Sequence, residues 1–141
     1  MLINFENYKR MIDIVDSPYN SILLCQGSFS QFAGADQDNG ESIYDMIEYF
    51  VKRARVLYVH FRNVSGTVPK FHETFVNTGH VDMYRAMRIY AENGFDGFFM
   101  DDHVPQTIGD STWGHRSKAY ANGYIQSLIE TVTDTSLYGL H

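Results

Sequence analysis

"VLYVHF", at residues 56–61, is a short apolar run that carries one histidine near its end. A run of this length, rich in β-branched and aromatic residues, is typical of a strand buried on both faces of a parallel sheet. Two more runs share the pattern, "SILLC" at residues 21–25 and "FDGFFM" at residues 95–100. Because helical periodicity separates the three runs, the sequence predicts an α/β protein with a parallel sheet covered by helices.

Four segments space their apolar residues three or four positions apart, as amphipathic helices do. Their apolar positions are Phe5, Tyr8, Ile12 and Val15; Ile43, Met46, Ile47, Phe50, Val51 and Ala54; Met83, Ala86, Met87 and Tyr90; and Ala121, Tyr124, Ile125, Leu128 and Val132. Ser42 suits the N-cap of the second helix, and Asn93-Gly94 suits the end of the third. Residues 26–42 and 62–80 are polar and rich in glycine, so we expect loops there. The predicted order is helix, strand, helix, strand, helix, strand, helix.

The segments after the predicted strands are long and carry ionisable residues, whereas those after the helices are short. In parallel α/β folds the chemistry takes place at the carboxyl ends of the strands. Here the three ends offer Cys25, His60 and Asp102-His103. Thiolate, imidazole and carboxylate together suit a divalent first-row metal such as Mn, Fe, Co or Zn.

Each of these residues also has a purely structural interpretation. A lone cysteine on an apolar strand is more often inert core, and an Asp-Asp-His run can be turn and cap chemistry. A nucleophilic role for Cys25 is disfavoured, because no base with an orienting partner accompanies it in the sequence. The placement at equivalent ends of three strands favours a metal site, with the structural interpretation left open. The other histidines, His72, His80 and His141, lack such neighbours, and we expect them at the surface.

Basic and amide side chains near the predicted strand ends indicate an anionic substrate. Arg62 and Asn63 closely follow His60, while His115 and Arg116 precede the last predicted helix, whose N-terminal N–H groups favour anions. Arginine binds carboxylates through two parallel hydrogen bonds. Solvated ion pairs at the surface are the alternative for both arginines.

Composition excludes several classes of function. The chain has 141 residues, 44% of them hydrophobic, enough for one folded domain, and its net charge of -6 disfavours binding to nucleic acid or anionic lipid. Its single cysteine cannot form an intramolecular disulfide, which fits a reducing compartment. No apolar run approaches the roughly 20 residues that span a bilayer, and the N-terminal residues lack a signal-peptide pattern. We therefore expect a cytoplasmic protein with a small-molecule substrate.

Five stretches of the chain resemble the mannonate dehydratase family. They are "DSPYNSILLCQGS" (16–28), "VHFRNVSGTVPKFHETF" (59–75), "VDMYRAMR" (81–88), "DHVPQTIGD" (102–110) and "WGHRSKAYANGYIQSL" (113–128). The resemblance implies a (β/α)8 TIM barrel of the xylose-isomerase-like kind. It further implies dehydration of D-mannonate to 2-keto-3-deoxy-D-gluconate in hexuronate (glucuronate) catabolism, with Mn(II) or Fe(II) as the cofactor.

The matching motifs also imply roles for individual residues. Cys25, His60 and Asp102 resemble the metal ligands of the family, and His103 resembles a catalytic acid or base beside the metal. Arg62-Asn63 matches the substrate-facing part of the "HFRN" motif. The family's metal site includes a further histidine from an earlier strand, which no residue upstream of Cys25 supplies. Some members use a catalytic tyrosine after the Asp-His motif, whereas the nearest tyrosine here falls inside the last predicted helix.

The resemblance covers only the C-terminal part of the family's barrel. About three parallel strands and four helices are predicted, so we expect residues 1–141 to form one partial barrel segment with no internal boundary. Three interpretations remain open: a mannonate dehydratase, a related metal-dependent sugar isomerase or epimerase, and an inactive fragment. An incomplete barrel leaves sheet edges and apolar surface open, so the chain is expected to form a homo-oligomer or to need the missing N-terminal half-barrel.

Overall fold

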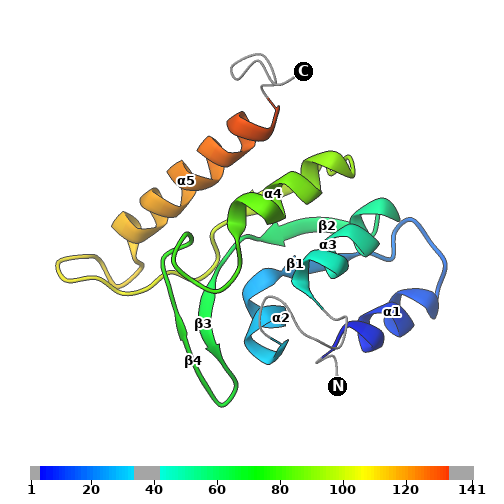
Figure 1. The fold of residues 1–141 in the computed structure, drawn as a ribbon, viewed down its shortest axis with the longest axis horizontal. Helices are drawn as coiled ribbons and strands as arrows, with labels where there is room; N and C mark the ends of the chain where they lie inside the picture. Colours follow the sequence, from blue (N-terminus) through cyan, green and yellow to red (C-terminus); the bar gives the residue numbers. More distant parts are fainter. Residues whose placement is uncertain (1–3, 34–41, 134–141) are drawn as a thin grey trace.

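The computed structural model describes residues 4–33 and 42–133, and within these ranges it contains five helices and five strands (Figure 1). In chain order the elements are α1 (Phe5–Asp13), β1 (Ile22–Cys25), α2 (Gln26–Ala33), α3 (Ile43–Lys52), β2 (Val56–His60), β3 (Val64–Thr67), β4 (Lys70–Glu73), α4 (Met83–Glu92), β5 (Phe98–Met100) and α5 (His115–Thr133). The predicted α/β class is therefore confirmed. None of these helices is both long enough and apolar enough to cross a membrane.

Three strands form a parallel sheet in the order β1-β2-β5, at the positions that the sequence predicts. Cys25 pairs with His60, and His60 pairs with Met100, so the last residues of the three strands lie in one row. The segments that follow β1, β2 and β5 therefore leave the sheet at the same edge. This register gives the predicted convergence of ionisable residues its structural basis.

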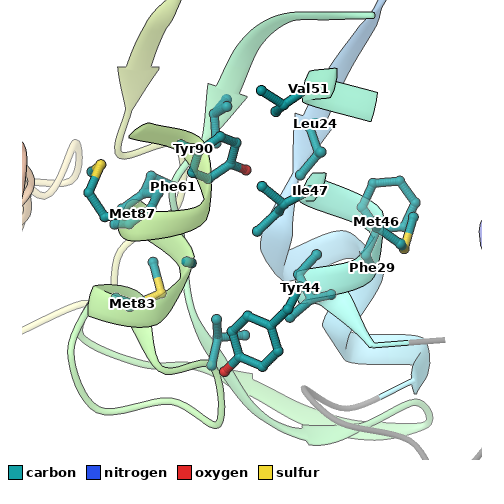
Figure 2. Close-up of a cluster of buried hydrophobic side chains, with 14 of the residues drawn as sticks. Leu24, Phe29, Tyr44, Met46, Ile47, Val51, Phe61, Met83, Met87 and Tyr90 are labelled. Atoms are coloured by element: carbon teal, nitrogen blue, oxygen red, sulfur yellow. The ribbon is translucent and has the colours of Figure 1, made fainter. Parts of the chain in front are cut away.

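Helices α3 and α4 cover one face of the sheet and form the core with it. Leu24 of β1 and Ile47 of α3 lie close together there and are fully buried (Figure 2). Val59, which pairs with Leu24 in the sheet, is fully buried as well. Alternation along a strand sends every second side chain to the same face, and the periodic stripes of the two helices meet it there. Ser42 caps α3 by accepting a hydrogen bond from the N–H of Asp45, as the sequence predicts.

The opposite face of the sheet is less well covered. Tyr58 stacks on Phe98 with the ring centroids 4.9 Å apart and the planes 8° apart. Phe98 is nevertheless 58% exposed and Met100 is 40% exposed. The described helices therefore leave apolar surface of β5 open, as expected for an incomplete barrel.

Two segments predicted to be loops contain regular structure. Residues 26–33 form α2 directly after β1, which makes five helices rather than the four predicted, and Phe29 and Ser30 of α2 are buried. Residues 64–73 form an antiparallel hairpin of β3 and β4, in which Gly66 has a φ of +78°. Both elements are short and polar in sequence, and tertiary contacts stabilise them, so periodicity did not reveal them.

The last helix also starts earlier than predicted. The apolar stripe begins at Ala121, but α5 begins at His115, so His115 and Arg116 lie in its first turn and not before it. Gly114, with a φ of +67°, turns the chain into the helix. The side chain of Asp110 accepts hydrogen bonds from the N–H groups of Arg116 and Ser117. The start of α5 is therefore set by these hydrogen bonds to its first N–H groups, and not by the apolar stripe.

Candidate metal centre

Cys25, His60 and Asp102 come together at the carboxyl edge of the sheet. Each offers a ligand atom, and these atoms all lie within 4.8 Å of one another. His60 Nδ1 lies 3.2 Å from Asp102 Oδ2, and Cys25 Sγ lies 3.9 Å from the same oxygen. Cys25 is only 9% exposed, and the side chains of His60 and Asp102 are 18% and 19% exposed. The three predicted ligands therefore form one partly buried cluster.

The donor set of this cluster fits a divalent transition metal. One sulfur, one imidazole nitrogen and one carboxylate oxygen meet at the ends of three different strands. Borderline-soft first-row ions accept such a mixed set, whereas Mg²⁺ and Ca²⁺ prefer oxygen alone. The Oγ of Ser28 donates a 3.1 Å hydrogen bond to Cys25 Sγ, which holds the sulfur in place.

The turn that carries Asp102 is held in an unusual conformation. Asp102 has a φ of +56°, in the left-handed region that costs a non-glycine residue about 1–2 kcal/mol. Lys118 of α5 donates a 2.7 Å hydrogen bond to the carbonyl oxygen of Asp102 and lies 3.3 Å from Asp101 Oδ2. Asp101 is buried, so its carboxylate and the ammonium of Lys118 fasten the turn to α5. Strain held in this way is common at functional sites.

Arg62 lies against the ligand cluster and is 6% exposed. Its Nη2 donates a 2.7 Å hydrogen bond to Glu73 Oε1, and its Nε donates a 3.2 Å bond to Glu73 Oε2. Its Nη1 is 3.6 Å from Cys25 Sγ and 3.7 Å from Asp102 Oδ2. The guanidinium is thus already engaged by protein groups, and a direct contact with substrate stays a prediction.

Asn63 is fully buried and supports the loop before α4. Its Nδ2 donates to the carbonyl oxygens of Val76 and Val81, at 3.0 and 2.9 Å. Its Oδ1 accepts from the N–H groups of Val64 and Val81, both at 3.1 Å. These four bonds fix residues 76–81 beside the hairpin, and a contact between Asn63 and substrate stays a prediction.

His103 projects from the same edge with its side chain 61% exposed. Its Nε2 lies 3.6 Å from Asp102 Oδ1, and its Nδ1 lies 3.6 Å from Glu73 Oε1. The imidazole therefore stands beside the ligand cluster, where a molecule from solvent can reach it. This placement suits an acid or base, and that role stays a prediction.

The first turn of α5 holds the remaining predicted substrate residues. Arg116 lines a pocket of about 350 Å³ together with Phe75, Thr107 and Tyr120. The N–H groups of this turn already bond Asp110, and these bonds lower the pKa of its carboxyl from 3.8 to about 2. A carboxylate of the protein thus occupies the N-terminus of α5, and a contact between Arg116 and substrate stays a prediction. His115 is exposed and stays a predicted contact.

The sequence-based prediction placed His80 at the surface and did not include Glu73, and the structure differs on both residues. His80 was expected at the surface but is partly buried, its Nε2 has no hydrogen-bond partner in the described residues, and burial lowers its pKa. His72 is exposed as expected, and His141 lies outside the described residues. Glu73 was not predicted at all. A glutamate after the "FH" of a polar segment carries no signal until the hairpin is known.

The parallel strands of this α/β protein end in a Cys-His-Asp cluster. This arrangement places the protein in the class of candidate metal-dependent α/β enzymes. The family model described as "D-mannonate dehydratase (UxuA)" matches residues 1–137. The chain therefore belongs to the D-mannonate dehydratase family, as the resemblance predicted.

Similar proteins agree with this assignment. The mannonate dehydratase of Thermotoga neapolitana is 36% identical over 139 residues, covering 94% of this chain and 37% of that protein. That of Lactococcus lactis subsp. lactis is 30% identical over 142 residues, covering 94% and 38%. The crystal structure of mannonate dehydratase from Streptococcus suis serotype 2 matches with a TM-score of 0.81 and 27% identity, covering 92% of this chain and 37% of that one. The chain thus spans little more than a third of the length of these relatives.

Proposed function

We propose that residues 1–141 form the metal-binding segment of a mannonate dehydratase, a carbon-oxygen lyase that converts D-mannonate to 2-keto-3-deoxy-D-gluconate and water in hexuronate catabolism. The observation that carries the proposal is the Cys25-His60-Asp102 cluster, whose ligand atoms lie within 4.8 Å in a chain of this family. The partly buried arrangement at three strand ends favours this over a purely structural role for the three residues.

The proposed cofactor is Mn(II) or Fe(II), held by Cys25 Sγ, a His60 ring nitrogen and an Asp102 carboxylate oxygen. When bound, a divalent cation supplies stabilisation of the negative charge that develops on a substrate carboxylate. Ser28 and Lys118 keep two of the ligands in place, through the Cys25 sulfur and the backbone of Asp102. The donor set favours a transition metal, and the choice between manganese and iron is part of the proposal.

The protein groups have two tasks in the proposed reaction. A base removes the proton at C2, the electron pair of that bond forms the C2–C3 double bond, and the C3 hydroxyl leaves with a proton as water. The enol that remains at C2 then becomes the ketone. We assign one of the two proton transfers to His103, because its exposed imidazole stands beside the ligand cluster. General acid or base help of this kind contributes roughly 10²–10⁴-fold.

Arg116 is the proposed binding group for the substrate carboxylate. It lines a pocket with aromatic and hydroxyl-bearing side chains, which suit the faces and hydroxyl groups of a sugar acid. His115, next to it, and Arg62 and Asn63, next to the ligand cluster, are the other proposed substrate residues. A related sugar isomerase or epimerase would need a carboxylate-binding arginine less, so an Arg116→Ala variant that retains acid binding would favour that alternative.

The proposed fold is one continuous segment of a (β/α)8 barrel that further strands complete. The support is the open apolar surface of β5, where Phe98 is 58% exposed and Met100 is 40% exposed. A closed barrel fills its interior with side chains from all its strands. These further strands would come from an N-terminal half-barrel or from association with a further copy of the chain.

Mannonate dehydration with Mn(II) tests the proposal. We expect residues 1–141 alone to show little or no turnover, and residues 1–141 combined with the N-terminal part of the Thermotoga neapolitana relative to show turnover that His103→Ala abolishes. Mn(II) binding to residues 1–141, weakened by Cys25→Ser, tests the cluster independently of activity. Strong turnover by residues 1–141 alone would overturn the incomplete barrel. Failure to bind Mn(II) or Fe(II) would overturn the metal centre.

A further inference from the structure

The β3–β4 hairpin carries a carboxylate to the edge of the candidate metal centre. Glu73 is the last residue of β4, and it pairs in the ladder with Val64, directly after the "HFRN" motif. Its side chain is 24% exposed, and both of its oxygens accept hydrogen bonds from Arg62. This bidentate contact fixes the plane of the guanidinium as well as its position.

The same guanidinium contacts two residues of the ligand cluster, Cys25 and Asp102. Nη1 of Arg62 lies 3.6 Å from Cys25 Sγ and 3.7 Å from Asp102 Oδ2, on the side away from Glu73. Gln31 of α2 accepts a further 3.3 Å bond from Nη2. Arg62 therefore has its charged head between one carboxylate that holds it and two ligand residues that it touches.

The backbone of α2 lies close against the side chain of Arg62. A Cβ at Gly27 would lie 2.4 Å from Arg62 Nε and 2.6 Å from its Cγ. The glycine allows α2 to approach the side chain, and α2 then covers it. Arg62 therefore cannot leave its position without breaking its two hydrogen bonds to Glu73.

We propose that Glu73 is a positioning residue of the metal centre, which orders Cys25 and Asp102 by holding Arg62 against them. The inference rests on the proposed metal-binding function. Glu73 is not proposed as a metal ligand, because both of its oxygens bond the guanidinium. Groups that orient metal ligands from outside typically change metal affinity by about 10–100-fold when they are removed.

Cobalt binding to the 141-residue chain tests the proposal without requiring turnover. Co(II) bound to a thiolate gives a charge-transfer absorption that reports the Cys25–metal bond. We expect Glu73→Ala to weaken Co(II) binding by about 10–100-fold and to reduce this absorption. Glu73→Gln, which keeps the shape of the side chain, should weaken it as well, because an amide offers only one acceptor to the two N–H donors. His72→Ala is the matched control, since His72 precedes Glu73 on the same strand and is exposed.

A double-variant cycle shows whether Glu73 acts through Arg62. Once Arg62→Met has removed the guanidinium, Glu73→Ala should cause no further loss of Co(II) affinity. In the metal-free chain, the Nε–H proton of Arg62 should be protected from exchange, and Glu73→Ala should remove this protection. Circular dichroism identifies any variant that fails to fold, and Glu73→Gln then replaces Glu73→Ala in the cycle.

The possible outcomes separate this inference from the proposed function. Wild-type affinity and absorption in both folded Glu73 variants would overturn the positioning role and leave the metal centre standing. An equal loss with and without Arg62 would show that Glu73 acts independently of the arginine, which also overturns the inference. A wild-type chain that shows no thiolate–cobalt absorption would overturn the proposed metal centre itself, and the positioning role with it.

Discussion

Replacing Gly27 with alanine should destabilise the protein, although helix propensity alone predicts the opposite. Gly27 lies in the first turn of α2, where exchange of glycine for alanine ordinarily gains up to about 1 kcal/mol. The new Cβ would meet Arg62 at 2.4 Å from Nε, 2.6 Å from Cγ and 2.8 Å from Cζ. These distances are far below van der Waals contact, so the arginine side chain must move.

The magnitude follows from the bonds that this movement breaks. Arg62 would lose two charge-assisted hydrogen bonds to Glu73, each worth about 1.5–3 kcal/mol in a dry site. Since Glu73 is 24% exposed, water partly replaces them, and we discount the total to about 2–3 kcal/mol. After the helix-propensity gain is subtracted, Gly27→Ala should lower the free energy of unfolding by about 1–2 kcal/mol, or the Tm by roughly 5 °C.

Urea or thermal unfolding measures this change against a matched control. Gly123 lies within α5, where a Cβ would meet nothing within 4 Å. Gly123→Ala should therefore raise stability by up to about 1 kcal/mol. If both alanine variants raise stability equally, Arg62 is not held where the structure places it, and the reasoning about its clamp fails.

Three further predictions concern groups around the site and in the core. The N–H groups at the start of α5 lower the pKa of Asp110 to about 2, so the stabilisation by its carboxylate is fully present above about pH 4 and is lost as the pH falls through 2. Asp110→Ala should therefore flatten the pH dependence of the free energy of unfolding between pH 4 and 2. Lys118→Met removes the bonds to Asp101 and to the carbonyl of Asp102, and should lower both stability, by about 1–2 kcal/mol, and Mn(II) affinity in a titration. The hydroxyl of Tyr90 is buried without a hydrogen-bond partner in the described residues, so Tyr90→Phe should leave stability unchanged or raise it by about 1 kcal/mol in urea unfolding. A loss above 1 kcal/mol would mean that this hydroxyl has a partner.

Much of the architecture could be predicted from short patterns. The apolar runs at residues 21–25, 56–61 and 95–100 contain the three parallel strands. Parallel register then places equivalent strand ends side by side, which is why local sequence was enough to predict that Cys25, His60 and Asp102 meet. The same reasoning missed α2 and the β3–β4 hairpin, because neither has an apolar period that separates it from a loop.

Sequence pattern alone thus specified the sheet, its helical cover on one face and the identity of the ligand-type residues at its edge. The remaining features depend on contacts between segments distant in the chain. The hairpin brings Glu73 to Arg62, and α5 brings Lys118 to the left-handed turn at Asp102. Asp110 accepts hydrogen bonds at the N-terminus of α5, where the sequence predicted an anionic substrate. Periodicity reports which face of an element is buried. It does not report which polar group will meet another across that face, because such pairs form only once the elements have packed.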